Sequence, residues 1–271
     1  MPAIQSLKKQ LRSIGSTKKL TKAMKTISTV KFSKLNEIYT NFSEYGKQCE
    51  RIFCQYGGFL SDSLAAANSD APGLVIVIAG NKGLCGGFNT EILKFAKETL
   101  SKKESYLLAA CGKKAIGFFK SKNIPLYIEH VFNDVPTFEE CGALLEEIIS
   151  LRKEGKISDV SVIYPKYSNM MKQKPEICEL FTHESEEETE SVQFFPDKET
   201  ITQKTAINIF KARFFELVLE SAIGTQAATL ITMRAAYDTA EELYNKLERE
   251  INRLRQSAVT SDIIATTENH N

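Results

Sequence analysis

The chain has 271 residues, 42% of them hydrophobic and 25% charged, which is ordinary for a globular protein. Its formal net charge of +1 hides an uneven distribution, because residues 1–36 hold nine Lys or Arg and no Asp or Glu. We found no apolar run near the roughly 20 residues of a membrane span and no apolar segment typical of a secretory signal. The six cysteines form no Cys-x-x-Cys pair, which argues against a zinc site or a disulfide framework.

Residues 1–58 predict one long helix. The helix is expected to break near Gly15, where the apolar phase slips, and to end at Gly57-Gly58. Seven basic residues between 8 and 25 lack acidic partners for i,i+4 pairs, so they predict an acidic partner such as nucleic acid, a membrane surface or an acidic protein. Farther along, a heptad seam that requires a partner helix runs through Leu35, Ile38, Phe42, Tyr45, Cys49, Ile52 and Tyr56.

The middle of the chain alternates strand and helix patterns. Residues 74–79 form a continuous apolar run, typical of a parallel strand that is buried on both faces. Thr137 is a suitable N-cap for an amphipathic helix over 137–153. The alternation predicts a small sheet with helical crossovers. The expected strands are 74–79, 106–110, 124–131, 160–164 and 176–181, and the expected helices are 90–101, 113–120 and 137–153.

The glycine-rich segment 80–89 invites comparison with nucleotide-binding turns. It fits neither the P-loop pattern nor the G-x-G-x-x-G fingerprint of dinucleotide-binding folds. We therefore interpret Gly83, Gly86 and Gly87 as residues of tight turns. Since no Ser/His/Asp arrangement stands out and paired carboxylates gather only in the acidic run 184–190, the sequence predicts no catalytic residue, no cofactor and no metal.

Residues 200–265 predict a second long helix. Its seam is bulky at first and small from Ser221 onward, which lets helix axes approach closely. Two such helices most simply pair as an antiparallel coiled coil, and the alternative is that each packs on a larger domain. The seam is formed by Ile207, Phe210, Phe214, Leu217, Ser221, Gly224, Ala228, Ile231 and Ala235, and it resumes with Leu243, Leu247, Ile251, Leu254 and Ala258.

Three segments resemble the gamma subunit of rotary ATP synthases. Leu20-Thr-Lys-Ala-Met-Lys25 is similar to the family's Ile-Thr-Lys-Ala-Met-Lys signature. Lys82-Gly-Leu-Cys-Gly-Gly-Phe-Asn89 is similar to its Arg-Gly-Leu-Cys-Gly-Gly-Phe-Asn turn. Asn252-Arg-Leu-Arg-Gln-Ser-Ala-Val-Thr260 resembles its C-terminal Tyr-Asn-x-x-Arg-Gln-Ala-x-Ile-Thr. The three segments occur in the family's order and placement, and the resemblance covers nearly the whole chain.

The resemblance implies an α/β fold: a long antiparallel coiled coil of the helices at 1–58 and 200–265, with a central Rossmann-like domain at 72–182. It implies a non-catalytic central stalk that couples ion flow to chemistry in the beta subunits, on the cytoplasmic face of a bacterial membrane. The implied partners are the hexamer of alpha and beta subunits, the epsilon subunit and the membrane ring of c subunits. The contact residues that it implies are Lys22, Met24, Lys25, Gln226, Gln256 and Thr260.

The chain departs from the family pattern in two places: residues 265–271 lack the family's usual apolar, Ala-rich terminal helix, and one stretch of the second helix differs. Gly224-Thr225 and Thr229 replace a usual Ser-Glu pair and Arg, so a charged pair expected to contact beta is missing. Two other functions are open on the residues alone. One is a coiled-coil protein that binds nucleic acid through the basic helix. The other is a nucleotide-dependent enzyme that uses the turn at 80–89.

Overall fold

The structure is a computed structural model, and it describes residues 2–63, 68–103, 105–181 and 198–268. The acidic run 184–190 lies outside these ranges. The chain divides into two compact units, unit 1 with residues 1–29 and 229–271 and unit 2 with residues 30–228. The elements in chain order are α1 (Pro2–Ser63), β1 (Gly73–Ile78), α2 (Phe88–Leu100), β2 (Tyr106–Cys111), α3 (Lys113–Ser121), β3 (Ile128–His130), α4 (Phe138–Lys153), β4 (Val160–Asn169), β5 (Lys172–Glu179) and α5 (Lys198–Glu268).

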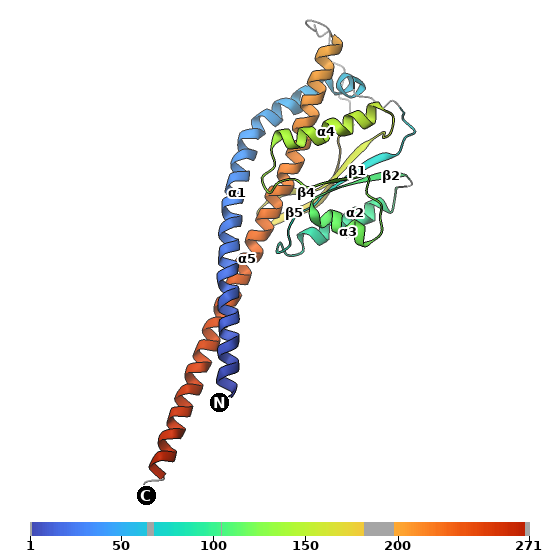
Figure 1. Cartoon of the computed structure of the whole chain (residues 1–271). Helices are drawn as coiled ribbons and strands as arrows, with labels where there is room; N and C mark the ends of the chain where they lie inside the picture. Colours follow the sequence, from blue (N-terminus) through green and yellow to red (C-terminus); the bar gives the residue numbers. More distant parts are fainter. Residues whose placement is uncertain (1, 64–67, 104, 182–197, 269–271) are drawn as a thin grey trace. The chain divides into compact units, whose positions relative to one another are not determined.

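Unit 2 is built on a five-stranded sheet in the order β3-β2-β1-β4-β5 (Figure 1). Strands β1 to β4 pair in parallel, whereas β5 pairs antiparallel with β4 as a hairpin. The hairpin is longer than the predicted strands at 160–164 and 176–181, because its outer half is polar and exposed and carries no apolar alternation. The strand predicted at 124–131 is reduced to β3, since the stretch around Pro125 does not join the ladder.

The sheet is covered on both faces, with α2 and α3 on one side and α4 and α5 on the other (Figure 1). Alternate residues of β1 explain this arrangement. Leu74, Ile76 and Ile78 face the core shared with α4 and α5. Val75, Val77 and Ala79 face the core shared with α2 and α3. The continuous apolar run at 74–79 is therefore required by burial on both faces, as the sequence predicts.

Helix α4 begins where the sequence predicts, because Thr137 caps it. The Thr137 hydroxyl oxygen accepts a hydrogen bond of 3.2 Å from the Glu140 backbone N–H, one of the unpaired donors of the first turn. Acidic residues in the first turn and basic residues in the last favour the helix dipole.

Within unit 2, α1 and α5 pair in antiparallel orientation, because residues earlier on α1 contact residues later on α5. The Phe53 ring packs edge-on against Phe210 with centroids 5.5 Å apart, and the Phe42 ring packs against Phe215 at 4.9 Å. The predicted seam on α1 is wrong in part: Cys49 and Phe53 are buried, whereas Tyr45 and Ile52 are exposed. The sheet and α4 also pack against the α1–α5 pair, so the buried positions of α1 do not follow a strict heptad.

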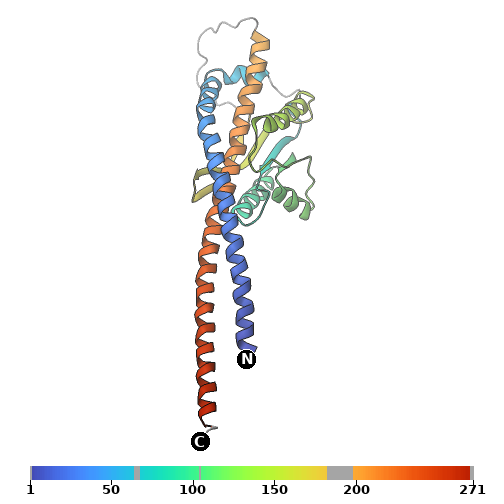
Figure 2. The same ribbon diagram turned by 60° about the vertical axis from the view of Figure 1, so that its left-hand side comes forward.

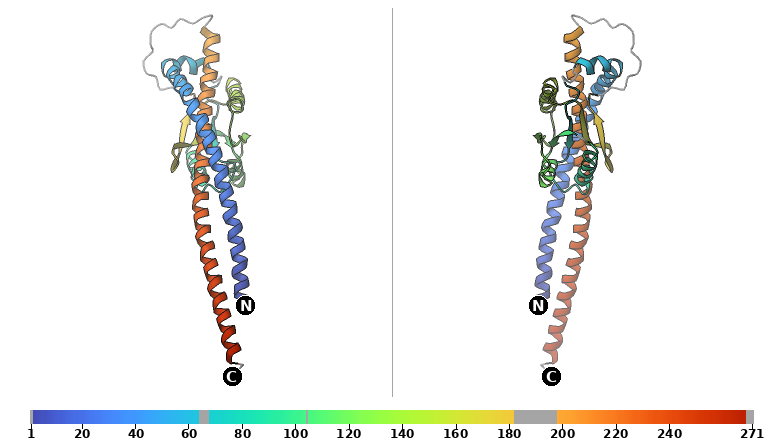
Figure 3. Two further views of the ribbon diagram at one scale, coloured as in Figure 1. Left: turned by 90° about the vertical axis from the view of Figure 1, so that its left-hand side faces the viewer. Right: turned by 90° about the vertical axis from the view of Figure 1, so that its right-hand side faces the viewer.

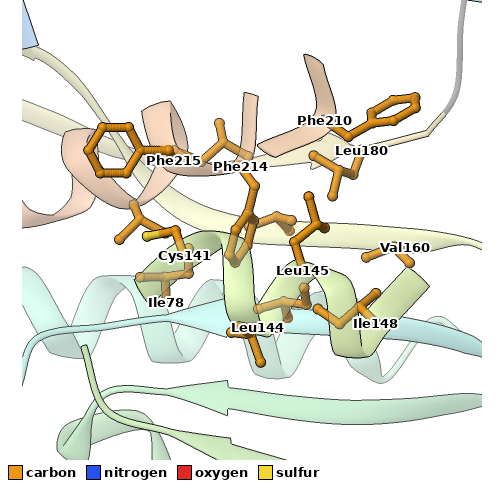
Figure 4. Packing of buried hydrophobic residues seen from close by; sticks show 14 of the residues in the cluster. Ile78, Cys141, Leu144, Leu145, Ile148, Val160, Leu180, Phe210, Phe214 and Phe215 are labelled. Carbon is orange, nitrogen blue, oxygen red and sulfur yellow. The ribbon is translucent and has the colours of Figure 1, made fainter. Parts of the chain in front are cut away.

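Helix α5 is buried on several sides in unit 2 rather than along one seam. Between residues 206 and 223 it packs against α1, α4 and the sheet. Figure 4 shows Phe214 projecting from α5 among Cys141, Leu144 and Leu145 of α4. Half of the most apolar window of α5 is buried, so the helix resembles a core helix, although 202–261 is long and apolar enough to span a membrane by length and composition. The sequence reading overlooked this apolar stretch.

Within unit 1, the described parts of α1 and α5 lie side by side in antiparallel orientation (Figures 2 and 3). The Lys18 ammonium contacts the Glu241 carboxylate at 2.9 Å, and Gly15 lies against Tyr244. The last turns of α5 extend past the first described residue of α1 (Figure 2). The sequence left two alternatives for the long helices, and each describes one unit. In unit 1 the helices form a two-helix pair, and in unit 2 they pack on a larger domain.

Two predicted interruptions of α1 are wrong, because the helix continues through both Gly15 and Gly57-Gly58. The buried and half-buried positions of α1 in unit 1 keep heptad spacing, but several of them are polar. Thr21 can be buried because its hydroxyl donates a hydrogen bond to the Thr17 carbonyl at 3.0 Å, so the hydroxyl has a partner within the helix. The seam positions are Ile4, Leu7, Leu11, Ile14, Lys18, Thr21, Lys25 and Ser28.

The α5 seam in unit 1 also differs from the prediction. The predicted Ile251 is buried, but so are Met233 and Ala240, which were not predicted, whereas the predicted Ile231 and Leu243 are 37% and 45% exposed. The buried residues join the half-buried Tyr237, Tyr244 and Leu247 in one heptad stripe. Tyrosines and small residues on this stripe match the polar seam of α1, and apolar character alone therefore misplaced the interface.

Candidate functional site

A basic groove lies between the two helices of unit 1. It has a volume of about 660 Å³ and is lined by seven α1 residues between 11 and 22 together with Tyr237 and Tyr244 of α5. Gly15 opens the groove, since a Cβ at this position would lie 3.3 Å from the Tyr244 ring. The phase slip seen at Gly15 in the sequence therefore marks a close approach to an aromatic ring and not a break in the helix.

Lysines and tyrosines share this groove. The Lys18 Nζ lies 5.7 Å from the Tyr237 ring centroid and 5.5 Å from that of Tyr244, within the range of a cation–π interaction. Hydrogen bonding to Glu241 raises the pKa of Lys18, so this residue is a charged member of the helix interface. Arg12, Lys19 and Lys22 are exposed around it. The groove thus presents a cluster of positive charge beside two aromatic rings.

The six contact residues implied by the resemblance do not form one cluster. Lys22, Met24 and Lys25 lie together on α1 in unit 1, with Lys25 Nζ 5.9 Å from the Tyr237 ring centroid. Gln256 and Thr260 are exposed near the end of α5, where the Thr260 hydroxyl donates to the Gln256 carbonyl at 2.9 Å. Gln226 belongs to unit 2 and lines a small cavity beside Gly80 and Asp134.

The glycine-rich segment 80–89 is held by Asn89. Its side-chain oxygen accepts from the Gly80 N–H at 2.9 Å, and its amide donates to the Lys82 carbonyl at 3.1 Å. Leu84 and Gly86 adopt positive φ, 67° and 60°, so the segment makes a tight loop. Some backbone N–H and C=O groups of the segment form hydrogen bonds with the Asn89 side chain, which agrees with the sequence-based interpretation of a structural turn.

Asp134 connects the glycine-rich turn to α1, a feature that sequence reading missed. Its carboxylate contacts Lys31 of α1 and, at 2.8 Å, Lys82 of the turn. Burial opposes ionisation, but the hydrogen bonds from Lys31 and Lys82 outweigh it and hold the pKa of Asp134 below its ordinary value. No sequence signal could have found this group, because its three members are distant along the chain.

The departure at 224–225 is an internal packing site. A Cβ at Gly80 would lie 3.2 Å from the Thr225 methyl carbon, and a Cβ at Gly224 would lie 3.3 Å from the Phe88 ring. Gly224 is buried and Thr225 is half-buried against these elements of unit 2. Thr225 therefore lies beside the glycine-rich turn in unit 2.

Two carboxylates are half-buried where α5 meets α1 and the β4–β5 hairpin. Glu220 accepts a hydrogen bond from the Tyr167 N–H at 3.1 Å and one from the Tyr39 hydroxyl at 3.4 Å. Burial raises the pKa of Glu220 despite these bonds, and burial together with Glu50 raises the pKa of Glu216. Desolvation and the same carboxylates raise the pKa of Tyr39 to about 12.

This pair predicts a pH dependence of stability. A raised pKa means that the folded state holds the proton more tightly than the unfolded state. The stability that each carboxyl group contributes is therefore fully present below the unfolded pKa, near 4.5, and is lost as pH rises through the folded pKa. In the double variant Glu216→Gln/Glu220→Gln, the free energy of unfolding should fall less steeply with pH between the unfolded and the folded pKa values. Urea unfolding at a series of pH values would measure this slope. Glu44→Gln is the control, because Glu44 is exposed beside Lys47 and has a lowered pKa. An unchanged slope in the double variant would contradict the assignment.

The thiols and carboxylates give no sign of redox or metal chemistry within the described ranges. The pKa of Cys111 is raised to about 12 by complete burial, and burial likewise raises the pKa of Cys85 and Cys141, which disfavours reactive thiolates. Among the described residues, no group of three or more His, Cys, Asp or Glu side chains could hold a metal ion.

Comparison with known proteins connects this geometry to a family. The profile of the ATP synthase family matches residues 3–267. The ATP synthase gamma chain of Clostridium novyi is 29% identical, with 95% of this chain and 94% of the relative covered. That of an Exiguobacterium species is 28% identical, with 97% and 96% covered.

Solved structures share the fold. A chain in the rotor of the Euglena gracilis mitochondrial ATP synthase matches with a TM-score of 0.66 at 16% identity, over 95% of this chain and 99% of that chain. A chain in another structure of that enzyme, comprising OSCP, F1 and the c-ring, matches with a TM-score of 0.68 at 17% identity, over 99% and 93%. The chain therefore belongs to the ATP synthase family, as a gamma chain with the fold found in the rotor.

Proposed function

We propose that this chain is the central rotary stalk of an ATP synthase. The observation that carries the proposal is the antiparallel pairing of two helices from opposite ends of the chain, in a sequence that the family profile matches over residues 3–267. The chain itself performs no chemistry in this role. ATP is made or hydrolysed at the beta subunits, and the stalk couples those sites to ion flow through the membrane ring.

The partners of this stalk are the hexamer of alpha and beta subunits, the epsilon subunit and the c-subunit ring. The structure of the Euglena enzyme that shares this fold contains OSCP, F1 and the c-ring, which supports the hexamer and the ring as partners. A peripheral position on the cytoplasmic face of a bacterial membrane agrees with the bacterial sources of the relatives. The c-subunit ring, and not this chain, determines which ion is coupled.

Differential contact is the physical basis of the role. A shaft shifts the conformation of a surrounding subunit only if it interacts unequally with the alternative states. Unit 1 has such unequal faces, since the groove side carries exposed Arg12, Lys19 and Lys22 and neighbouring faces carry exposed Leu20 and Ile27. We propose Lys22, Met24, Lys25, Gln226, Gln256 and Thr260 as subunit contacts.

Reconstitution tests the proposed function directly. The chain would be mixed with purified alpha and beta subunits of its source, and stoichiometry and ATPase rate compared with alpha and beta alone. One copy per three alpha and three beta subunits, with a stimulated rate, is the expected result. Failure to join folded alpha and beta subunits would overturn the proposal, and salt-sensitive binding of duplex DNA by the same preparation would favour the nucleic-acid alternative.

The basic groove predicts a charge effect on assembly. Lys19→Glu/Lys22→Glu should weaken binding to the hexamer roughly tenfold at low salt, because two exposed attractive charges of the groove at an electrostatically steered interface become repulsive. The difference should shrink as salt screens the charges. The control is Lys246→Glu/Lys94→Glu, which makes the same change in net charge at one exposed site on α5 and one on α2. Equal effects of the two double variants, measured by titration of the assembly, would contradict a specific role.

A further inference from the structure

Both long helices are attached to the same edge of the sheet at the point where they leave unit 2. The unit boundary falls at residue 30 on α1 and at residue 228 on α5. The edge is formed by the glycine-rich turn, which follows β1, and by the loop at 131–137, which follows β3. We refer to Lys31, Lys82 and Asp134, together with the Gly80–Thr225 and Phe88–Gly224 contacts, as the exit clamp.

On the α1 side, the clamp is an ionic bridge. Asp134 is contacted by Lys31 one residue inside the boundary and by Lys82 from the turn at 2.8 Å. The Lys31 and Asp134 side chains are only 28% and 25% exposed, so solvent screens this pair less than a surface ion pair. One carboxylate therefore joins two lysines that would otherwise face each other as like charges.

The loop that carries Asp134 is itself fixed. The Asn81 side-chain amide donates to the Phe132 carbonyl at 2.7 Å, and the Asn133 N–H donates to the Glu140 carboxylate at 3.1 Å. Phe132 is buried and packs near Phe214 of α5, with ring centroids 6.3 Å apart. Asp134 thus projects from a held backbone and can position Lys31, which a mobile loop could not do.

On the α5 side, the clamp is a close packing contact. Gly80 and Thr225 approach so closely that a Cβ on Gly80 would lie 3.2 Å from the Thr225 methyl carbon. One position earlier on α5, Gly224 leaves room for the Phe88 ring, which a Cβ would meet at 3.3 Å. Gly80 and Phe88 flank the glycine-rich turn that carries Lys82, so the same segment holds α1 through charge and α5 through shape.

We propose that the exit clamp sets the stiffness with which α1 and α5 emerge from unit 2, and that Asp134 is its positioning residue. Without the carboxylate, Lys31 and Lys82 repel each other, and α1 loses its ionic connection to the turn. In a stalk, this point must carry torque between the sheet domain and the helices. The functional importance of the clamp rests on the proposed function, whereas its effect on local structure does not.

The first experiment tests the local structure in the isolated full chain. Amide hydrogen exchange would be followed over 79–89 and 30–36 in the wild type and in Asp134→Asn. We expect exchange in both segments to become roughly tenfold faster in the variant, and the conservative Asp134→Glu to recover most of the protection. Lys34→Gln is the matched control, because Lys34 is exposed on α1 and makes no ion pair with any described residue. Unchanged exchange in Asp134→Asn would overturn the clamp.

The second experiment tests the mechanical role in the reconstituted complex. A bead on unit 2 would report angular fluctuations while the hexamer is held on a surface, and a softer shaft gives a wider distribution. We expect about a twofold larger variance for Asp134→Asn, and wild-type variance for Asp134→Glu and Lys34→Gln. If Asp134→Asn does not fold, Lys31→Gln and Lys82→Gln test the two halves of the bridge with the carboxylate retained.

The outcomes separate this inference from the proposed function. If the wild-type chain fails to assemble, the stalk role is wrong, and the exchange experiment still decides whether the clamp exists. If the wild type assembles and rotates while the variance of Asp134→Asn is unchanged, the clamp proposal is overturned and the stalk role stands.

Discussion

Gly112→Ala should lower the free energy of unfolding of unit 2 by roughly 3 to 5 kcal/mol, a large part of the stability of an ordinary domain. Gly112 joins β2 to α3 with a φ of +101°, which L side chains rarely adopt. An added Cβ would lie 2.0 Å from the Ala79 carbonyl oxygen, closer than any real contact. The change would force apart the ends of β1 and β2, where the Ala79 N–H donates to the Cys111 carbonyl.

Gly117→Ala supplies the matched control for this prediction. Gly117 lies inside α3, and an added Cβ would meet nothing within 4 Å. Alanine favours a helix interior by about 0.8–1.0 kcal/mol over glycine, so this variant should be more stable than the wild type. Urea unfolding followed by far-UV circular dichroism would compare the two, because the chain contains no Trp. Similar destabilisation by both changes would refute the steric explanation.

Phe214→Ala should destabilise unit 2 by about 3 to 5 kcal/mol through loss of apolar burial and creation of a cavity. The Phe214 side chain is fully buried and lies between α5 and α4 (Figure 4). It also contacts the Phe132 ring from the loop that carries Asp134, with centroids 6.3 Å apart. Its removal therefore weakens the attachment of α5 to the α/β core.

The half-buried Phe118 on α3 provides a comparison of the same chemistry, and Phe118→Ala should cost clearly less than Phe214→Ala. Hydrogen exchange across unit 2 would locate the loss: Phe214→Ala should weaken protection in α4 and α5, whereas Phe118→Ala should act near α3. Equal losses from the two variants would show that depth of burial does not control the effect.

Local signals in the sequence were sufficient for most of the α/β elements. The apolar run at 74–79 is typical of a strand that is buried on both faces, and Thr137 is a local N-cap signal. The long helices also follow from periodicity. Their ends and seams do not, because Gly15 and Gly57-Gly58 are ordinary stop signals and the helix nevertheless continues through them.

The candidate sites divide in the same manner. The basic character of α1 and the glycine-rich turn can be read directly, since each is a continuous segment. The Lys31–Asp134–Lys82 bridge and the Glu220 contacts with Tyr39 and Tyr167 cannot, because each joins residues from three separate elements. Spacing along the chain carries no information on such groups.

By itself, the sequence determined the order of the elements and the family, because periodicity, turn residues and short motifs are local properties of the chain. The tertiary structure alone decided which face of each long helix is buried. In unit 1 that face includes Thr21 and Lys18, whose hydroxyl and ammonium groups are satisfied by the Thr17 carbonyl and by Glu241. A polar residue is tolerated in a seam when its hydrogen bonds are met there, and that condition depends on neighbours that only the folded chain brings together.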